Sequence, residues 1–168
     1  MTRCRFALAL ALVCAASAAP LRAQEDEGIG VGSAAPIIQV PDLDGRLVDL
    51  GQYIGHRPVY LQFWATWCTI CETLLPRVRA ARARYGDRVA FFGVNVAVNQ
   101  TRDRVRRYLG QHAVPFDVLY DERGVSQRAF AVPQTSYIVI IDATGKVAYT
   151  GVGTEQRFEA ALERVAGR

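Results

Sequence analysis

Two cysteines, Cys68 and Cys71, stand where an apolar run at 58–64 gives way to a stretch with helical periodicity at 69–85. The apolar run has the length and aromatic content of a buried strand, and Gly86 ends the helical stretch. Cys68 is therefore expected in the first turn of a helix that leaves the end of a strand. Unpaired N–H groups and the helix dipole favour an anion there, which stabilises a thiolate. A stabilised thiolate beside a second cysteine predicts thiol–disulfide exchange.

The first residues of the chain have the pattern of an export signal. Arg3 and Arg5 precede an uncharged stretch at 6–19, and small residues follow it. The uncharged stretch is shorter than the roughly 20 residues that a membrane-spanning helix needs. We therefore expect residues 1–23 to be a cleaved signal peptide and the mature protein to be periplasmic or otherwise exported. An uncleaved anchor and a lipoprotein modified at Cys14 are the two alternatives.

Removal of this signal changes how the charge and the cysteines are interpreted. The net charge of +4 includes the arginines of the signal, so the rest of the chain has 17 basic and 16 acidic residues. This near balance argues against nucleic acid as a partner. Cys68 and Cys71 are then the remaining cysteines, and a disulfide across so short a loop constrains the unfolded chain little. The pair is therefore expected to serve chemistry.

Strand-like and helical stretches alternate along the rest of the chain. An acidic, glycine-rich segment at 24–33 is expected to be a flexible linker to a domain at 34–168. A hairpin is expected at 37–40 and 46–48. Strands are expected at 59–64, 89–96, 114–120, 137–141 and 146–149. Helices are expected at 69–85, 101–112, 125–130 and 154–165. This alternation predicts an α/β fold, a three-layer α/β/α sandwich with a mixed central sheet and an N-terminal β-hairpin.

The segment Trp67-Cys68-x-x-Cys71, with a strand before it and a helix containing Pro76 after it, resembles the thioredoxin-like fold. It is most similar to the exported thiol–disulfide oxidoreductases of the TlpA and ResA type, in the redoxin superfamily. Relatives of that group include cytochrome c maturation reductases. Weaker matches fall in the same order at 32–36, 42–45, 93–96, 114–116, 132–135 and 141–146. The resemblance covers residues 31–165.

The spacing of the cysteines predicts their roles. Cys68, at the helix start, is expected to be exposed and to attack a client disulfide, and the more buried Cys71 to resolve the mixed disulfide. The resemblance adds Pro133, with a cis bond after Val132, as a substrate-positioning residue, and Trp67 along the approach to Cys68. No cofactor beyond the Cys68–Cys71 disulfide and no metal is expected. The expected partners are protein thiols and disulfides, with a membrane electron donor, and the chain is expected to be a monomeric reductant.

Two positions depart from the family pattern. Many thioredoxins have a buried Asp at the position of Gln62, and many exported relatives have a Glu at the position of Leu74. Both acids help to move protons to and from the inner cysteine. Glu72 is the nearest acid here, but it is expected to face solvent. We therefore expect the proton of Cys71 to move through water, or weakly through Glu72.

Two other functions compete with thiol–disulfide exchange. A thiol peroxidase of the redoxin type usually has a Pro-x-x-x-Thr-x-x-Cys setting, whereas Thr66 stands two residues before Cys68 and no proline is placed correctly. A copper-binding or delivery module would use both thiolates, often with Met or His ligands. The chain has no methionine after Met1, and His56 and His112 are far from the motif in sequence. Thiol–disulfide exchange is therefore the leading hypothesis.

Overall fold

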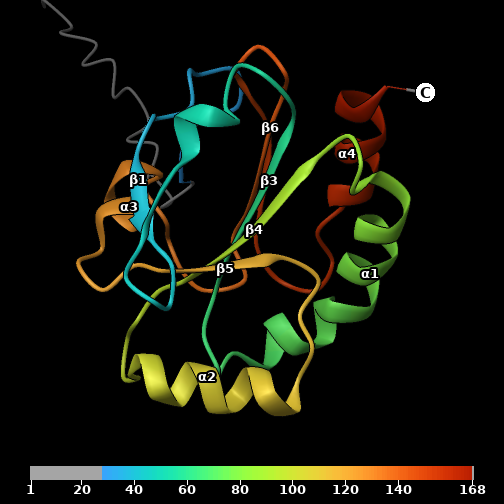
Figure 1. Cartoon of the computed structure of the whole chain (residues 1–168). Coiled ribbons are helices and arrows are strands. Elements are labelled where there is room, and N and C mark those ends of the chain that lie inside the picture. The colour runs from blue at the N-terminus through green and yellow to red at the C-terminus, as the bar shows by residue number, and fades with distance from the viewer. Residues whose placement is uncertain (1–27, 168) are drawn as a thin grey trace, which may run out of the picture.

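The computed structural model describes residues 28–167, so the signal peptide expected at 1–23 lies outside the described residues. The centre of the described domain is a five-stranded sheet (Figure 1). The strands, in spatial order, are β5 (Asp117–Tyr120), β4 (Ala90–Asn95), β3 (Val59–Trp64), β6 (Ile138–Ile141) and β7 (Val147–Gly151). β3, β4 and β5 are parallel, whereas β6 pairs antiparallel with β3, and β7 with β6. The sheet is therefore mixed, as predicted.

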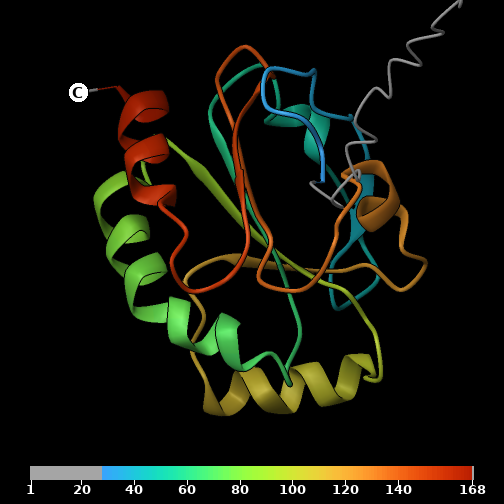
Figure 2. The same ribbon diagram turned by 180° about the vertical axis from the view of Figure 1, so that it is seen from behind.

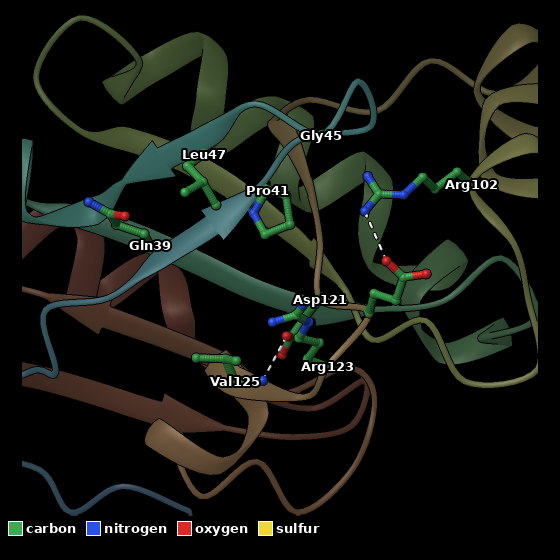
Figure 3. A pocket seen from close by; sticks show the side chains of 9 residues that line it. Gln39, Pro41, Gly45, Leu47, Arg102, Asp121, Arg123 and Val125 are labelled. Carbon is green, nitrogen blue, oxygen red and sulfur yellow. Dashed lines mark hydrogen bonds and ion pairs between the residues drawn. The ribbon is translucent and has the colours of Figure 1, made fainter.

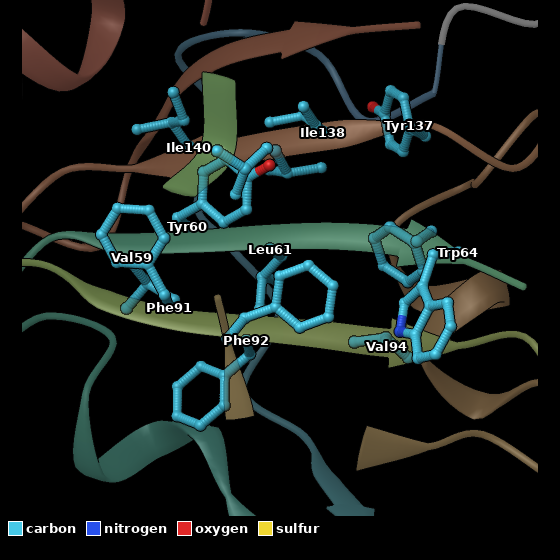
Figure 4. Close-up of a cluster of buried hydrophobic side chains, with 14 of the residues drawn as sticks. Val59, Tyr60, Leu61, Trp64, Phe91, Phe92, Val94, Tyr137, Ile138 and Ile140 are labelled. Atoms are coloured by element: carbon cyan, nitrogen blue, oxygen red, sulfur yellow. The ribbon is translucent and has the colours of Figure 1, made fainter. Parts of the chain in front are cut away.

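The two central strands carry the core. Every residue of β3 and of β4 is buried, as expected for strands that are covered on both faces. Tyr60 stacks on Phe91 with ring centroids 4.9 Å apart (Figure 4). Phe63, which points to the other face of β3, lies 5.9 Å from the ring of Phe130. This packing on both faces holds the end of β3, from which the cysteine motif leaves.

Helices and short elements cover the two faces of the sheet (Figures 1 and 2). α1 (Thr69–Tyr85) and α4 (Phe158–Ala166) lie side by side on one face. The other face is covered by β1 (Gln39–Pro41), β2 (Leu47–Asp49), the 3-10 helix η1 (Leu50–Gln52) and α3 (Val125–Ala129). α2 (Arg102–Gln111) lies across the end of the sheet at which α1 begins. The layers and the antiparallel hairpin of β1 and β2 are those predicted.

The last helix begins later than predicted. It was expected at 154–165, but α4 starts at Phe158. The carbonyl oxygens of Thr154 and Gln156 accept hydrogen bonds from the guanidinium of Arg77, at 2.6 Å each. A side chain of α1 therefore occupies carbonyl groups that a longer α4 would have used within itself. No helix within residues 28–167 combines the length and the hydropathy of a membrane-spanning segment.

The described end of the predicted linker, residues 28–33, is attached to the domain. The N–H of Ile29 donates to the carbonyl oxygen of Phe130 (3.1 Å), and the N–H of Gly32 donates to that of Val147 (2.8 Å). The predicted flexible linker is therefore wrong for these residues. The prediction was based on the glycine and acidic side chains of this segment. The hydrogen bonds that attach the segment are made by backbone N–H groups, which do not depend on side-chain type.

Candidate active site

Cys68 caps the N-terminus of α1. Its backbone is extended (φ −84°, ψ 93°), and its Sγ accepts a hydrogen bond from the N–H of Cys71 at 3.1 Å. Cys68 and Cys71 are joined in a disulfide with Sγ atoms 2.01 Å apart. After reduction, the same N–H and the helix dipole are directed at the Cys68 sulfur and favour its thiolate form. The predicted helix start and the predicted partner are both confirmed.

The disulfide is more buried than predicted. Cys68 is 5% exposed and Cys71 is 4% exposed, so the expectation of an exposed Cys68 is wrong for this oxidised form. The reason is the capping geometry, which turns the Cys68 sulfur back onto the helix instead of toward solvent. The exposed apolar side chains are the neighbours Trp67 (45%) and Ile70 (40%). A client is therefore expected to meet these two side chains before it meets sulfur.

A groove of about 370 Å³ begins at Trp67, the residue before Cys68. It is lined by Trp67, Val96, Val98, Gln127 and the segment 132–135, and none of these side chains is charged. The indole Nε1–H of Trp67 donates to the carbonyl oxygen of Val98 at 2.9 Å, which holds the ring on one wall. Val132 and Pro133 line the same groove. The structure thus brings together Trp67, Val132 and Pro133, as the sequence predicted.

Two residues of this groove, Val98 and Gln127, were missed by the sequence analysis. Val98 follows the end of β4, the strand beside β3 in the parallel part of the sheet. Loops at the carboxyl ends of adjacent parallel strands meet at one edge of a sheet, so this position was a usable signal. Gln127 lies in α3, and its Nε2 donates to the carbonyl oxygen of Val96 at 3.2 Å. That contact depends on tertiary folding and has no local signal.

The Val132–Pro133 peptide bond is trans, so the predicted cis bond is wrong. Residues in the left-handed region of backbone space stand at both ends of the segment, Ala131 with φ 46° and Ser136 with φ 70°. Pro133 nevertheless remains in the wall of the groove.

The positions that carry acids in relatives are fully buried and uncharged here. Gln62 and Leu74 are both 0% exposed. The Oε1 of Gln62 accepts a hydrogen bond from the hydroxyl of Tyr60 at 2.8 Å. Burial raises the pKa of that hydroxyl well above its usual value, and the charge of Glu159 adds to the increase. The Tyr60 hydroxyl therefore stays neutral at ordinary pH, and the Gln62 amide carries no charge.

Glu72 faces solvent, as predicted. Its Oε1 accepts a hydrogen bond from the hydroxyl of Tyr108 at 3.3 Å. Burial, together with the negative charge of Glu72, raises the pKa of Tyr108. Within residues 28–167, no three His, Cys, Asp or Glu side chains gather as a metal ion would require.

A larger cavity of about 460 Å³ lies away from the cysteines, between the hairpin, the start of α2 and the start of α3 (Figure 3). Its Asp121 is 2% exposed and accepts hydrogen bonds from the backbone N–H groups of Val125 (2.7 Å) and Gln127 (3.0 Å). Arg102 pairs with Glu122 at 3.1 Å. These groups are engaged in holding α3 and α2, and the cavity contains no thiol. The smaller groove is therefore the better candidate for the active site.

Comparison with known proteins agrees with this geometry. The profile of the family described as Redoxin matches residues 30–165. The thiol-disulfide oxidoreductase ResA of Geobacillus thermodenitrificans (strain NG80-2) is 30% identical over 144 residues, which cover 84% of this chain and 81% of ResA. ResA of Bacillus thuringiensis subsp. konkukian is 27% identical over 146 residues, covering 84% and 82%. A putative thiol:disulfide interchange protein DsbE from Chlorobium tepidum superposes with a TM-score of 0.71 at 28% identity, covering 83% of this chain and 99% of that one.

Proposed function

Since the chain belongs to the redoxin family and is a thiol–disulfide oxidoreductase of thioredoxin-like fold, we propose that it reduces disulfides of protein clients outside the cytoplasm. One observation carries the proposal. The Cys68 sulfur sits on the N-terminus of α1, accepts the N–H of Cys71 and shares a disulfide with it. An attacking sulfur and a resolving sulfur are thus already within bonding distance.

The reaction is a two-step exchange. In the reduced protein, the Cys68 thiolate attacks one sulfur of a client disulfide, the client S–S bond breaks, and the released client sulfur takes up a proton. Cys71 then loses its proton and attacks the Cys68 sulfur, which breaks the mixed disulfide and releases the second client sulfur as a thiol. The client gains two electrons and two protons, and the Cys68–Cys71 disulfide forms. A dithiol donor, such as a membrane protein with its own cysteine pair, must reduce this disulfide again.

The groove beside Trp67 is where the client chain would bind. Trp67, Val132 and Pro133 all line it. An uncharged groove next to exposed Trp67 and Ile70 suits an extended, apolar client segment that flanks the cysteine. Trp67, Val132 and Pro133 are therefore assigned to client positioning.

Proton transfer at Cys71 would use water. Gln62 and Leu74 replace the acids of relatives, and both side chains are fully buried. An amide and an alkyl group cannot take up the proton of a thiol. Glu72 is exposed and already accepts the hydroxyl of Tyr108. The second step is therefore expected to depend on solvent, with at most a weak contribution from Glu72.

The export assignment rests on residues 1–23, which lie outside the described residues. Their positive start and uncharged core favour export and cleavage. The resemblance to cytochrome c maturation reductases makes apocytochrome c one candidate client. Fractionation of cells that produce the full chain would test the location, and a shorter mature mass in the soluble exported fraction is expected.

The direction of the reaction is tested by the redox potential of the Cys68–Cys71 couple. Equilibration with glutathione should give a value below about −200 mV for a reductant, whereas a value near about −120 mV would assign the protein as an oxidant. The step order is tested with Cys71→Ser, which should accumulate a mixed disulfide between Cys68 and a client such as insulin. Failure of Cys71→Ser to form any mixed disulfide would contradict the mechanism.

A further inference from the structure

The groove segment 132–135 ends at Ser136, a residue that is fully buried and has φ 70°. Its N–H donates to the carbonyl oxygen of Phe63 at 2.8 Å. Its carbonyl oxygen accepts the side-chain amide of Gln156 at 3.0 Å, and its Oγ accepts the N–H of Gly153 at 3.1 Å. A buried residue in this strained conformation persists only where its surroundings hold it. Ser136 is held from two sides, by β3 and by the loop before α4.

Gln156 is the residue that links the two segments. It is 6% exposed, and its Nε2 donates both to Ser136 and to the carbonyl oxygen of Gly153, the latter at 2.8 Å. Its Oε1 has no hydrogen-bond partner within the described residues. The side chain therefore acts through its two donated bonds, which tie the end of the groove wall to the loop at 152–157.

Arg77 ties that loop to α1, the helix that carries the cysteines. Its Nη1 donates to the carbonyl oxygen of Thr154 and its Nη2 to that of Gln156, both at 2.6 Å. The same guanidinium makes a bidentate contact with Glu159, at 2.6 and 2.8 Å, and lies 5.0 Å above the ring of Phe158. A planar guanidinium with all three nitrogens engaged fixes both direction and distance.

We propose that Arg77 and Gln156 are positioning residues that hold the 132–135 wall of the groove at a set place relative to Cys68. The path runs from α1 through Arg77 to the loop at 152–157, and through Gln156 and Ser136 to the groove wall. This inference rests on the proposed function, because it takes the groove as the place where a client chain binds. A protein client must contact the wall and the sulfur together, whereas a small disulfide needs the sulfur alone.

The network is therefore expected to matter for protein clients and not for small disulfides. Loss of the network should weaken the binding of protein clients and leave the chemistry of Cys68 unchanged. A purely structural role would affect both classes of substrate alike, or neither. The chain offers a matched control in Arg84, which also joins α1 to α4, through Glu163 at 3.4 Å. Among the described residues, Arg84 makes no hydrogen bond or ion pair with the 152–157 loop.

The experiment compares Gln156→Met, Arg77→Met and Arg84→Met in the reduced protein. Methionine keeps the volume of Gln156 and removes its two donated bonds. With insulin as the protein disulfide, KM is expected to rise about three- to tenfold in Gln156→Met and in Arg77→Met, with kcat unchanged. With the small disulfide dithiobis-nitrobenzoate, the rate should equal that of the wild type, and so should the redox potential against glutathione. Arg84→Met should match the wild type in every measurement.

Two results would overturn the inference: a parallel loss of activity with insulin and with the small disulfide, or an unchanged KM for insulin. If Arg77→Met does not fold, Gln156→Met and Ser136→Gly still decide the matter. Glycine relieves the strain at φ 70° and removes only the Oγ acceptor, so a smaller rise in KM is expected. Wild-type protein that does not reduce insulin, or activity that survives in Cys68→Ser, would remove the proposed function itself. Wild-type activity with equal KM in all variants would remove only the positioning role.

Discussion

The first turn of α1 and the middle of the same helix differ in how the protein surrounds them. At the first turn, the disulfide has exposed apolar neighbours, and the groove beside it contains no charged side chain. Two turns later, Arg77 makes a bidentate ion pair and two further hydrogen bonds to backbone carbonyls. The groove beside the reacting turn is thus uncharged and accessible to a client, while the middle of the helix is held by the Arg77 ion pair and hydrogen bonds. A helix can present a reactive sulfur accurately when the turns that follow the sulfur cannot shift.

Replacement of the reacting atom should have the largest effect. Cys68→Ser removes the sulfur that accepts the N–H of Cys71, and a serine hydroxyl is not a nucleophile for disulfides at neutral pH. Reduction of insulin should fall to the uncatalysed rate. The hydroxyl can still cap α1, so the melting temperature should equal that of wild-type protein reduced in the same buffer. Residual catalysis would place the attacking sulfur elsewhere.

Replacement of the buried Gln62 by an acid should have the next largest effect, a loss of stability. Gln62 lies on the sheet face that α1 and α4 cover, because the neighbouring Tyr60 contacts Phe158 of α4. Gln62→Asp puts a carboxyl group into a fully buried position, and unfolding in urea should show a loss of about 3 kcal/mol at neutral pH. The pH profile of the second step should gain a titrating group.

Glu72→Gln is the control for that variant, because Glu72 is exposed. Its pH profile for the second step should shift by less than about one pH unit relative to wild type, since exposed charges interact weakly. A larger shift would mean that Glu72, and not water, takes the proton of Cys71.

Removal of the Arg77 charge from the middle of α1 should have a moderate effect on stability. Arg77→Met removes four hydrogen bonds and leaves Glu159 without its partner. The free energy of unfolding should fall by about 2 kcal/mol. Arg84→Met removes a pair whose side chains are 67% and 61% exposed, and should cost less than about 0.5 kcal/mol. Equal losses in the two variants would contradict the anchoring role of Arg77.

Lowering the pH should have the smallest effect on stability, through the ion pair of Arg77 and Glu159. Burial acts to raise the pKa of Glu159, but the hydrogen bond and charge of Arg77 outweigh burial, so the pKa in the folded protein lies below the ordinary 4.5. A carboxyl group with a lowered pKa stabilises the fold above its ordinary pKa, and this contribution is lost as the pH falls through the folded value. Because the Glu159 side chain is 43% exposed, the contribution should be below about 1 kcal/mol. The stability difference between wild type and Glu159→Gln should therefore shrink below pH 4.5; a constant difference would argue against the pair.

Local patterns predicted most of the fold correctly. α1 begins at Thr69 and ends at Tyr85 as expected, because a capping residue precedes it and a glycine follows it. β3 and β4 were recognisable as continuous apolar runs, the sequence pattern typical of strands that are covered on both faces. Trp67, Val132 and Pro133 were placed at one site through resemblance, and the groove contains all three. The cis bond at Pro133 and the exposure of Cys68 were wrong, because both depend on how surrounding segments turn.

The amino-acid sequence was enough to establish the chemistry of this protein: a cysteine at a helix start, a second cysteine one turn later, and the strand that delivers them. These features are local, and a helix N-terminus stabilises a thiolate wherever it occurs. Only the tertiary structure brought Ser136, Gln156 and Arg77 into one network and formed a groove at Trp67, the residue before Cys68. Those hydrogen bonds join residues 20 and 79 positions apart along the chain. Contacts over such separations depend on the packing of whole elements, which leaves no mark in the spacing of neighbouring residues.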